Sequence, residues 1–196
     1  MFHKTSARYS AAFLGLLLAL GSCKKETTPK PNAYLALNYP KQEYKTYENS
    51  YHHFTFDLNK NATAKELKST AFEIHYPEMK ATIFMNYKTV DNNLDVLLKD
   101  AQKLTYEHFI KADEIIEQPF LNEKDRVFGM FYHVGGNAAT NVQFYATDSV
   151  KNFVVASLYF YAKPNFDSIL PASHYIQQDM RQMLESLKWE KAAKDN

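Results

Sequence analysis

The residues that could do chemistry in this chain are one cysteine and seven histidines. A single thiol cannot close an intramolecular disulfide or build a cysteine-based metal site. Only His52 and His53 are adjacent, and on a strand their side chains would point to opposite faces and would not chelate one ion. The chain contains neither an HExxH motif nor a Cys/His cluster. We therefore expect no metal site.

Motifs of phosphate binding and nucleophilic catalysis are also missing from the sequence. Gly135-Gly136 lacks the Lys and Ser/Thr of a phosphate-binding loop, and its glycines suit a hairpin turn. No serine lies in a GxSxG elbow. The sequence therefore predicts a non-enzymatic protein without catalytic residues or a cofactor. An enzyme would need a cleft where histidine and carboxylate groups converge, for example around His133 or His174.

The lone cysteine has a different chemistry available because of the residues that precede it. Residues 1–9 carry one Lys, one Arg and no acid, and residues 11–20 read AAFLGLLLAL. This pattern is typical of a secretory signal, whose apolar run is too short to span roughly 30 Å of hydrocarbon. The tetrad LGSC that ends at Cys23 resembles the bacterial lipobox, in which the cysteine is acylated. We predict a lipoprotein signal peptide over residues 1–22 and lipidation at Cys23.

The segment after the cysteine has the composition of a tether. Residues 24–32 read KKETTPKPN, with two prolines and no apolar side chain. Nine extended residues reach at most roughly 30 Å, so an acylated chain would hold the folded part close to its membrane. We predict a lipid-anchored tether at 23–32, one domain at 33–190 and a C-terminal tail at 191–196.

Composition excludes one class of partner and favours one class of fold. The 196 residues carry a formal net charge of +1, which is no electrostatic footprint for nucleic acid, so we expect no nucleic-acid partner. The chain has 14 Phe and 14 Tyr but only 5 Gly. Aromatic residues are enriched in strands, so this composition favours a sheet over a helix bundle.

The periodicity of apolar residues predicts a mixed order of strands and helices. Alternating patterns predict strands at 34–38, 53–58, 72–76, 81–87, 115–121, 126–134, 142–147 and 152–161. Apolar stripes of helical period predict helices at about 93–111 and 171–189. Short connections imply an antiparallel meander. The predicted fold is α+β, an antiparallel sheet of about seven to eight strands covered by two main helices, in an order that resembles the PsbP-like and Mog1-like sandwich.

Residues 39–51, YPKQEYKTYENSY, are the strongest candidate for a partner-binding surface. Tyrosine among polar residues is favoured at interfaces, because the ring gives contact area and the hydroxyl tolerates water. The spacing of Tyr44, Tyr47 and Tyr51 has an equally good structural explanation, a single helical turn folded over the edge of the sheet.

Four tracts make the chain resemble a known family. Residues 28–39, 93–120, 136–168 and 179–189 are similar, in this order, to the gliding motility lipoprotein GldD family of Bacteroidetes. The resemblance implies a non-enzymatic envelope component required for gliding and for the linked type IX secretion apparatus. It implies a membrane anchor at Cys23 and other gliding or secretion envelope proteins as partners. We expect a location facing the periplasm, at either the inner or the outer membrane.

A binding module remains the alternative to an assembly component. The aromatic excess would allow a small apolar or lipid ligand to be held between the sheet and the helices.

Overall fold

The computed structural model describes residues 39–48, 51, 54–106, 112–136, 138–161 and 166–190. The chain divides into two units, Met1–Ala33 and Tyr34–Asn196, and all described residues belong to the second. The expected signal peptide, the tether with Cys23, the strand at 34–38 and the tail at 191–196 lie outside the described residues and stay predictions.

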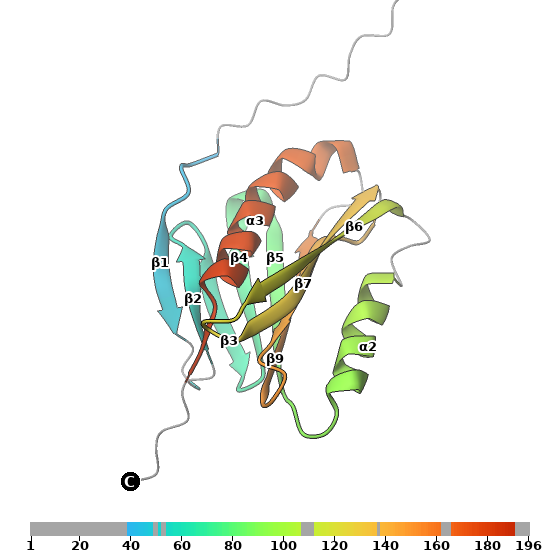
Figure 1. The fold of residues 1–196 in the computed structure, drawn as a ribbon. Helices are drawn as coiled ribbons and strands as arrows, with labels where there is room; N and C mark the ends of the chain where they lie inside the picture. Colours follow the sequence, from blue (N-terminus) through green and yellow to red (C-terminus); the bar gives the residue numbers. More distant parts are fainter. Residues whose placement is uncertain are drawn as a thin grey trace, which may run out of the picture. The chain divides into compact units, whose positions relative to one another are not determined.

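Seven antiparallel strands form the main sheet of the described unit (Figure 1). Their order across the sheet is β3-β4-β5-β9-β8-β7-β6. Their bounds are β3 Thr63–Lys68, β4 Ala71–Tyr76, β5 Ala81–Thr89, β6 Ala112–Asn122, β7 Val127–Gly136, β8 Thr140–Thr147 and β9 Asn152–Phe160. All six ladders of this sheet are antiparallel. Five of them join strands that follow one another in the chain through short connections, which suit antiparallel pairing. The sixth, between β5 and β9, joins strands that are separated by a long segment of the chain.

A second sheet has three strands in the order β1-β2-β10. They are β1 Tyr44–Glu48, β2 Phe54–Asn59 and β10 Lys188–Trp189. The apolar side chains of β2 alternate inward, with Phe54, Phe56 and Leu58 buried. Strand β2 is therefore the central strand of this sheet, with β1 from the start of the described unit on one side and β10 from its end on the other.

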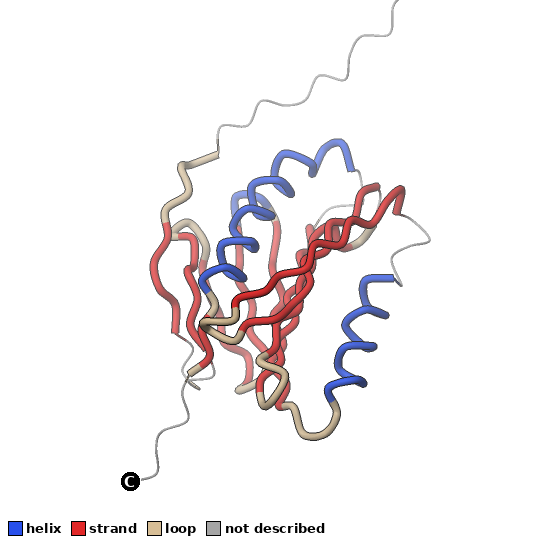
Figure 2. Tube along the Cα trace, in the orientation of Figure 1, coloured by secondary structure: helices blue, strands red, loops and turns tan. Residues whose placement is uncertain are grey.

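Two α-helices and one 3-10 turn complete the unit (Figure 2). The helices are α2 Leu94–Tyr106 and α3 Phe166–Ser186, and η1 Pro77–Met79 joins β4 to β5. Helix α3 and the three-stranded sheet cover one face of the main sheet, called here the inner face. Helix α2 packs on the opposite face, called the outer face, where Leu97 and Ala101 contact Phe153.

The main core lies between the inner face and the layer of α3. Helix α3 contributes a stripe at Ile176, Met180, Met183 and Leu184, all fully or almost fully buried. Burial of one such side chain stabilises the fold by about 1.5–3 kcal/mol. This core holds α3 far more strongly than the small cluster beneath α2 holds that helix.

The α+β class and the antiparallel sheet of seven strands are confirmed, but the sequence did not predict the second sheet. The predicted strands at 53–58, 72–76, 81–87, 115–121, 126–134, 142–147 and 152–161 correspond to β2, β4, β5, β6, β7, β8 and β9. Strands β1, β3 and β10 were missed. Their residues do not alternate cleanly: in β3 the half-buried residue Glu66 is a carboxylate, whereas the apolar Leu67 is exposed.

The second predicted helix was displaced from its true position. Helix α3 begins five residues before Pro171, which lies inside the helix, where its missing N–H removes one backbone hydrogen bond. The helix ends at Ser186, and Lys188–Trp189 pairs with β2 instead. The Trp189 indole N–H donates to the Arg126 carbonyl at 3.0 Å, which helps to fix this extended end.

Candidate functional site

The three candidate tyrosines lie in two different environments. Tyr44 and Tyr47 belong to β1 and are half-buried, so the alternative of a helical turn is wrong for them. The Tyr47 hydroxyl donates to Glu66 Oε1 at 2.8 Å, and its ring lies 5.2 Å from that of Phe56. Tyr51 follows the strand and is 47% exposed. A partner could therefore reach Tyr51 directly, whereas Tyr44 and Tyr47 also hold β1 in place.

Tyr44 is tied to a buried carboxylate of α3. Its hydroxyl donates to Asp179 Oδ1 at 2.9 Å. Burial raises the pKa of Tyr44, and the neighbouring carboxylate of Asp179 raises it further. Burial likewise raises the pKa of Tyr47, with the hydrogen bond to Glu66 as the second cause. Both phenols therefore stay protonated and serve as hydrogen-bond donors.

Asp179 is completely buried and accepts four side-chain hydrogen bonds. Gln42 Nε2 and the Tyr44 hydroxyl donate to Oδ1, each at 2.9 Å. Asn59 Nδ2 and the Tyr76 hydroxyl donate to Oδ2, at 2.8 and 3.0 Å. Burial raises the pKa of the Asp179 carboxyl, and the hydrogen bonds that it accepts oppose this rise. These residues, the Asp179 cluster, join four separate segments of the chain.

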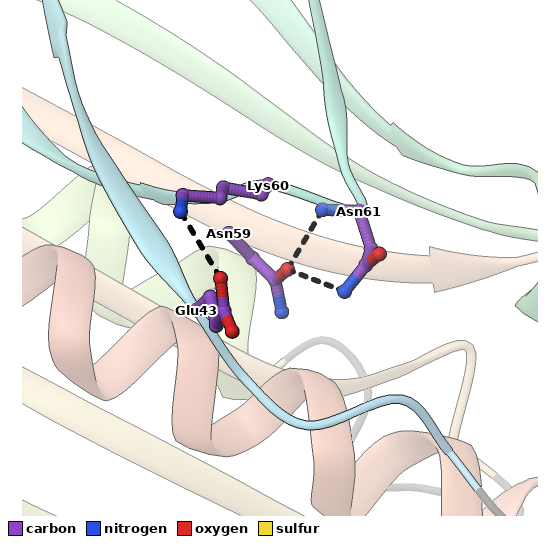
Figure 3. Close-up of polar contacts among 4 residues, drawn as sticks. All are labelled: Glu43, Asn59, Lys60 and Asn61. Carbon is purple, nitrogen blue, oxygen red and sulfur yellow. Dashed lines mark hydrogen bonds and ion pairs between the residues drawn. The ribbon is translucent and has the colours of Figure 1, made fainter.

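Asn59 takes part in the cluster because a turn fixes its side chain. Its Oδ1 accepts from the backbone N–H of Asn61 at 2.9 Å and from Asn61 Nδ2 at 3.2 Å (Figure 3). An exposed ion pair between Lys60 and Glu43, at 3.0 Å, lies beside the turn. The Asn59 amide nitrogen is then directed to Asp179 and to the Tyr175 hydroxyl. The cluster is a structural support for β1.

A second polar series crosses the outer face. His75 Nε2 lies 2.9 Å from Glu73 Oε2, and His75 Nδ1 lies 3.1 Å from Thr82 Oγ1. Thr82 Oγ1 is also 2.9 Å from the Tyr161 hydroxyl. The ladder between β4 and β5 places His75 directly opposite Thr82. A carboxylate, an imidazole and two hydroxyls are thus connected in one series, which we call the Glu73 relay.

The outer face is also hollowed between the sheet and α2. This groove, which we call the α2 groove, has a volume of about 910 Å³. Its floor is formed by side chains of β5 and β9, including the edge-to-face pair Phe84 and Tyr159, whose centroids are 5.5 Å apart. Leu97 and Leu104 of α2 form the wall. Across the mouth, Lys88 pairs with Asp100 at 3.8 Å.

Buried amide and hydroxyl groups fix α2 above the sheet. Gln143 Nε2 donates to the Ala101 carbonyl at 3.0 Å and to Thr105 Oγ1 at 2.6 Å. The Ser157 hydroxyl donates to Gln143 Oε1 at 3.1 Å. These groups are buried and their hydrogen bonds are satisfied, so they fix the distance between this part of α2 and the sheet. The groove lies beside them.

Neither His133 nor His174 forms an ion pair or hydrogen bond with a carboxylate of the described residues, although the charge of Glu114 acts on His133. The rings of His133 and His174 are 6.3 Å apart and nearly perpendicular. Burial lowers the pKa of His133, and the neighbouring His174 lowers it further. His52 and His53 lie outside the described residues. Over the described ranges, no three His, Cys, Asp or Glu side chains are grouped to hold a metal ion.

Sequence reasoning missed both polar clusters, although each left a trace. Asp179 falls within the apolar stripe of its helix, between Ile176 and Met180, and a charge at such a position indicates a buried partner. Glu73 and His75 are two residues apart in a predicted strand and therefore lie on the same face of it. The identity of Thr82 as their partner depends on the turn η1, which the sequence does not reveal.

The described unit is an α+β protein built on an antiparallel sheet. None of its described helices is both long enough and apolar enough to cross a bilayer. The chain belongs to the gliding motility lipoprotein GldD family, whose model matches residues 24–189. It is therefore a membrane-associated gliding motility lipoprotein.

Other comparisons concern the fold alone. No curated protein matches the sequence. Among solved structures the chain is similar to cyanobacterial PsbP (CyanoP) from Synechocystis sp. PCC 6803, with 9% identity and a TM-score of 0.49, over 87% of this chain and 99% of that one. It is also similar to the Ran-binding protein Mog1p from Saccharomyces cerevisiae, with 12% identity and a TM-score of 0.45, over 76% and 96%.

Proposed function

We propose that the protein is a non-enzymatic, membrane-held assembly or stability component of the gliding motility and type IX secretion machinery, facing the periplasm of a member of the Bacteroidetes. The observation that carries this proposal is the family match, which begins directly after Cys23 of the LGSC tetrad. An acylated Cys23 would be the anchor, and other gliding or secretion envelope proteins would be the partners.

The fixed start of the described unit supports a short-range role. Fifteen residues lie between Cys23 and Tyr39, and the Tyr39 ring packs on Tyr175 of α3 at 5.1 Å. A chain of this length spans at most about 55 Å. The protein would then act on partners close to its own membrane.

The geometry of the Glu73 relay supports a role without nucleophilic catalysis. Thr82 stands where a nucleophile would stand in a carboxylate–histidine–hydroxyl triad. Its side chain is completely buried and its hydroxyl is already bonded on two sides. A substrate carbonyl could not approach this oxygen.

The anchor is tested by complementing a gene deletion with Cys23→Ala. We expect no rescue of colony spreading or of protein secretion, because the variant cannot be acylated and is not held at the membrane. Ser22→Ala is the matched control, since it keeps a small residue before the cysteine and should restore both. Immunoblotting must find the variant in the cell. Full rescue by Cys23→Ala would remove the anchor from the proposed function.

A second candidate function is favoured by the α2 groove, namely a periplasmic module that holds a small apolar or lipid ligand. Ligand sites commonly have volumes of roughly 300–1,000 Å³ and largely apolar walls. The groove, at about 910 Å³, fits this description. Aromatic and aliphatic side chains line its floor and wall, and Ser157 and Asn86 supply neutral polar groups.

Leu104→Trp tests this candidate by filling the groove. We expect the affinity for the neutral dye Nile red to fall about tenfold, which corresponds to about 1.4 kcal/mol, because the indole would occupy the space of the ligand. Val96→Trp is the control, because Val96 lies on the exposed face of the same helix and is 57% exposed. Equal dye binding by both variants and the wild type would exclude the groove as the ligand site.

A further inference from the structure

A separate cavity opens at the other end of the outer face, beside β3, β4 and the start of β5. Its volume is about 600 Å³. The polar residues that line it include Thr63, Lys65, His75, Lys80 and Tyr161, and no Asp or Glu is among the described residues of its lining. Most of its accessible wall is apolar, and the side chains of fixed charge on it, Lys65 and Lys80, are both positive, so we call it the basic cavity.

Backbone pairing fixes both lysines at the cavity. Lys65 of β3 stands opposite Glu73 of β4, whose carboxylate is bonded to His75. Lys80 closes η1 in the left-handed region, with φ 49°, and its carbonyl accepts the backbone N–H of Tyr161 at 2.8 Å. Neither lysine forms an ion pair with any residue that the structure describes.

The backbone of Lys80 carries strain that a glycine would not. A side chain at positive φ costs free energy, and such positions concentrate at functional sites. A lysine at this position therefore places a charge beside the cavity at some cost to stability.

The Glu73 relay brings the Tyr161 hydroxyl to the same cavity. Thr82 is completely buried, whereas Tyr161 is 65% exposed. The relay therefore has one end that solvent or a ligand can reach. Its hydrogen bonds hold the phenol oxygen in position without using all of its bonding capacity, since a hydroxyl both donates and accepts.

We propose that the basic cavity binds the phosphate group of a ligand, with Lys65, Lys80 and the Tyr161 hydroxyl as its donors. A phosphate ester carries between one and two negative charges near neutral pH, which the two lysines balance in part, since the Glu73 carboxylate lies opposite Lys65. Ammonium and hydroxyl donors to an ionised oxygen make the stronger class of hydrogen bonds. The phosphate could come from a phospholipid headgroup or from a soluble phosphate ester. This site is independent of the proposed assembly function and of the α2 groove.

The relay leaves the Tyr161 hydroxyl able to donate into the cavity. Its oxygen lies 2.9 Å from Thr82 Oγ1, and either of the two hydroxyls can be the donor in this contact. When Thr82 donates, the phenol proton is available to a ligand in the cavity.

Calorimetric titration of the purified, acylated protein in neutral detergent tests the site. We expect saturable binding of inorganic phosphate, and a loss of about tenfold in affinity in each of Lys65→Ala, Lys80→Gly and Tyr161→Phe. Lys80→Gly should not lower the melting temperature, because glycine relieves the positive φ. Lys45→Ala and Tyr159→Phe are matched controls, since Lys45 and Tyr159 do not line the basic cavity.

Two further arms identify the source of the phosphate and test the Glu73 relay. Short-chain phosphatidylglycerol binding more tightly than inorganic phosphate, with phosphatidylcholine binding weakly, would indicate a lipid headgroup, and the reverse order a soluble ester. His75→Gln should weaken phosphate binding, because His75 contacts Thr82, which in turn contacts the Tyr161 hydroxyl. Absence of saturable binding, or unchanged affinity in all three cavity variants, would overturn the proposal.

Discussion

Asp179→Ala is expected to lower the free energy of unfolding by about 3–5 kcal/mol, because it removes the shared acceptor of four donors. Asn59 and Tyr76 are almost fully buried, so their donors would have no water to replace the carboxylate. Each unsatisfied buried donor costs about 1–3 kcal/mol. Relief of the buried charge offsets only part of this loss. Urea unfolding followed by circular dichroism measures the change.

Glu185→Ala is the matched control for this prediction. Glu185 is an exposed acid on the same helix, and its replacement should change stability by less than about 0.5 kcal/mol. If Asp179→Ala were as mild as the control, the cluster would not hold β1 on α3. The position of Tyr44 in the candidate partner surface would then need another explanation.

Asp179→Asn is a second arm of the same experiment, because it separates the charge from the hydrogen bonds. Burial raises the pKa of the folded carboxyl above its ordinary 3.8, so the folded state binds this proton more tightly than the unfolded chain. Its contribution to stability is present below about pH 3.8 and is lost as pH rises through the folded pKa. The stability of the wild type relative to D179N should therefore fall over this range, and a constant difference would contradict the raised pKa.

The sequence predicted the helices and strands whose apolar residues recur with a regular period. It missed the strands in which polar and apolar residues share one face. The inward residues of β4, among them Phe72 and Ile74, stand out from polar neighbours. Strand β3 reads TAKELK, and its Glu66 faces Tyr47 at 2.8 Å. A buried or half-buried carboxylate bonded to a tyrosine breaks the apolar alternation, so no pattern of hydrophobicity could identify this strand.

The polar clusters were beyond prediction because their members are distant in sequence. Asp179 meets Gln42 and Tyr44 across more than 130 residues. The Glu73 relay joins three strands whose registers depend on turn geometry, and a shift of one residue would turn His75 to the other face. The lipidation prediction at Cys23 differs in kind, because a local motif carries it and no tertiary contact is required.

Gly129→Ala is expected to destabilise the fold by about 2–4 kcal/mol through a steric clash in the sheet. Gly129 of β7 stands opposite Ala146 of β8. A methyl group at this position would overlap the Tyr145 carbonyl oxygen and would lie 3.3 Å from the Ala146 Cα. Both atoms belong to the backbone, so the two strands would have to separate, and urea unfolding would record the loss.

Gly135→Ala provides the control on the same strand. Its methyl group would meet Glu114 Cγ at 3.1 Å, and this exposed side chain can move aside, so we expect a cost below about 1 kcal/mol. The clash at Gly129 should also reach the outer face, because the Tyr145 ring stacks on Phe153 at 5.6 Å beneath α2. Gly129→Ala should therefore weaken Nile red binding in the α2 groove while Gly135→Ala leaves it unchanged, and equal stability of the two variants would show that β7 and β8 can separate without cost.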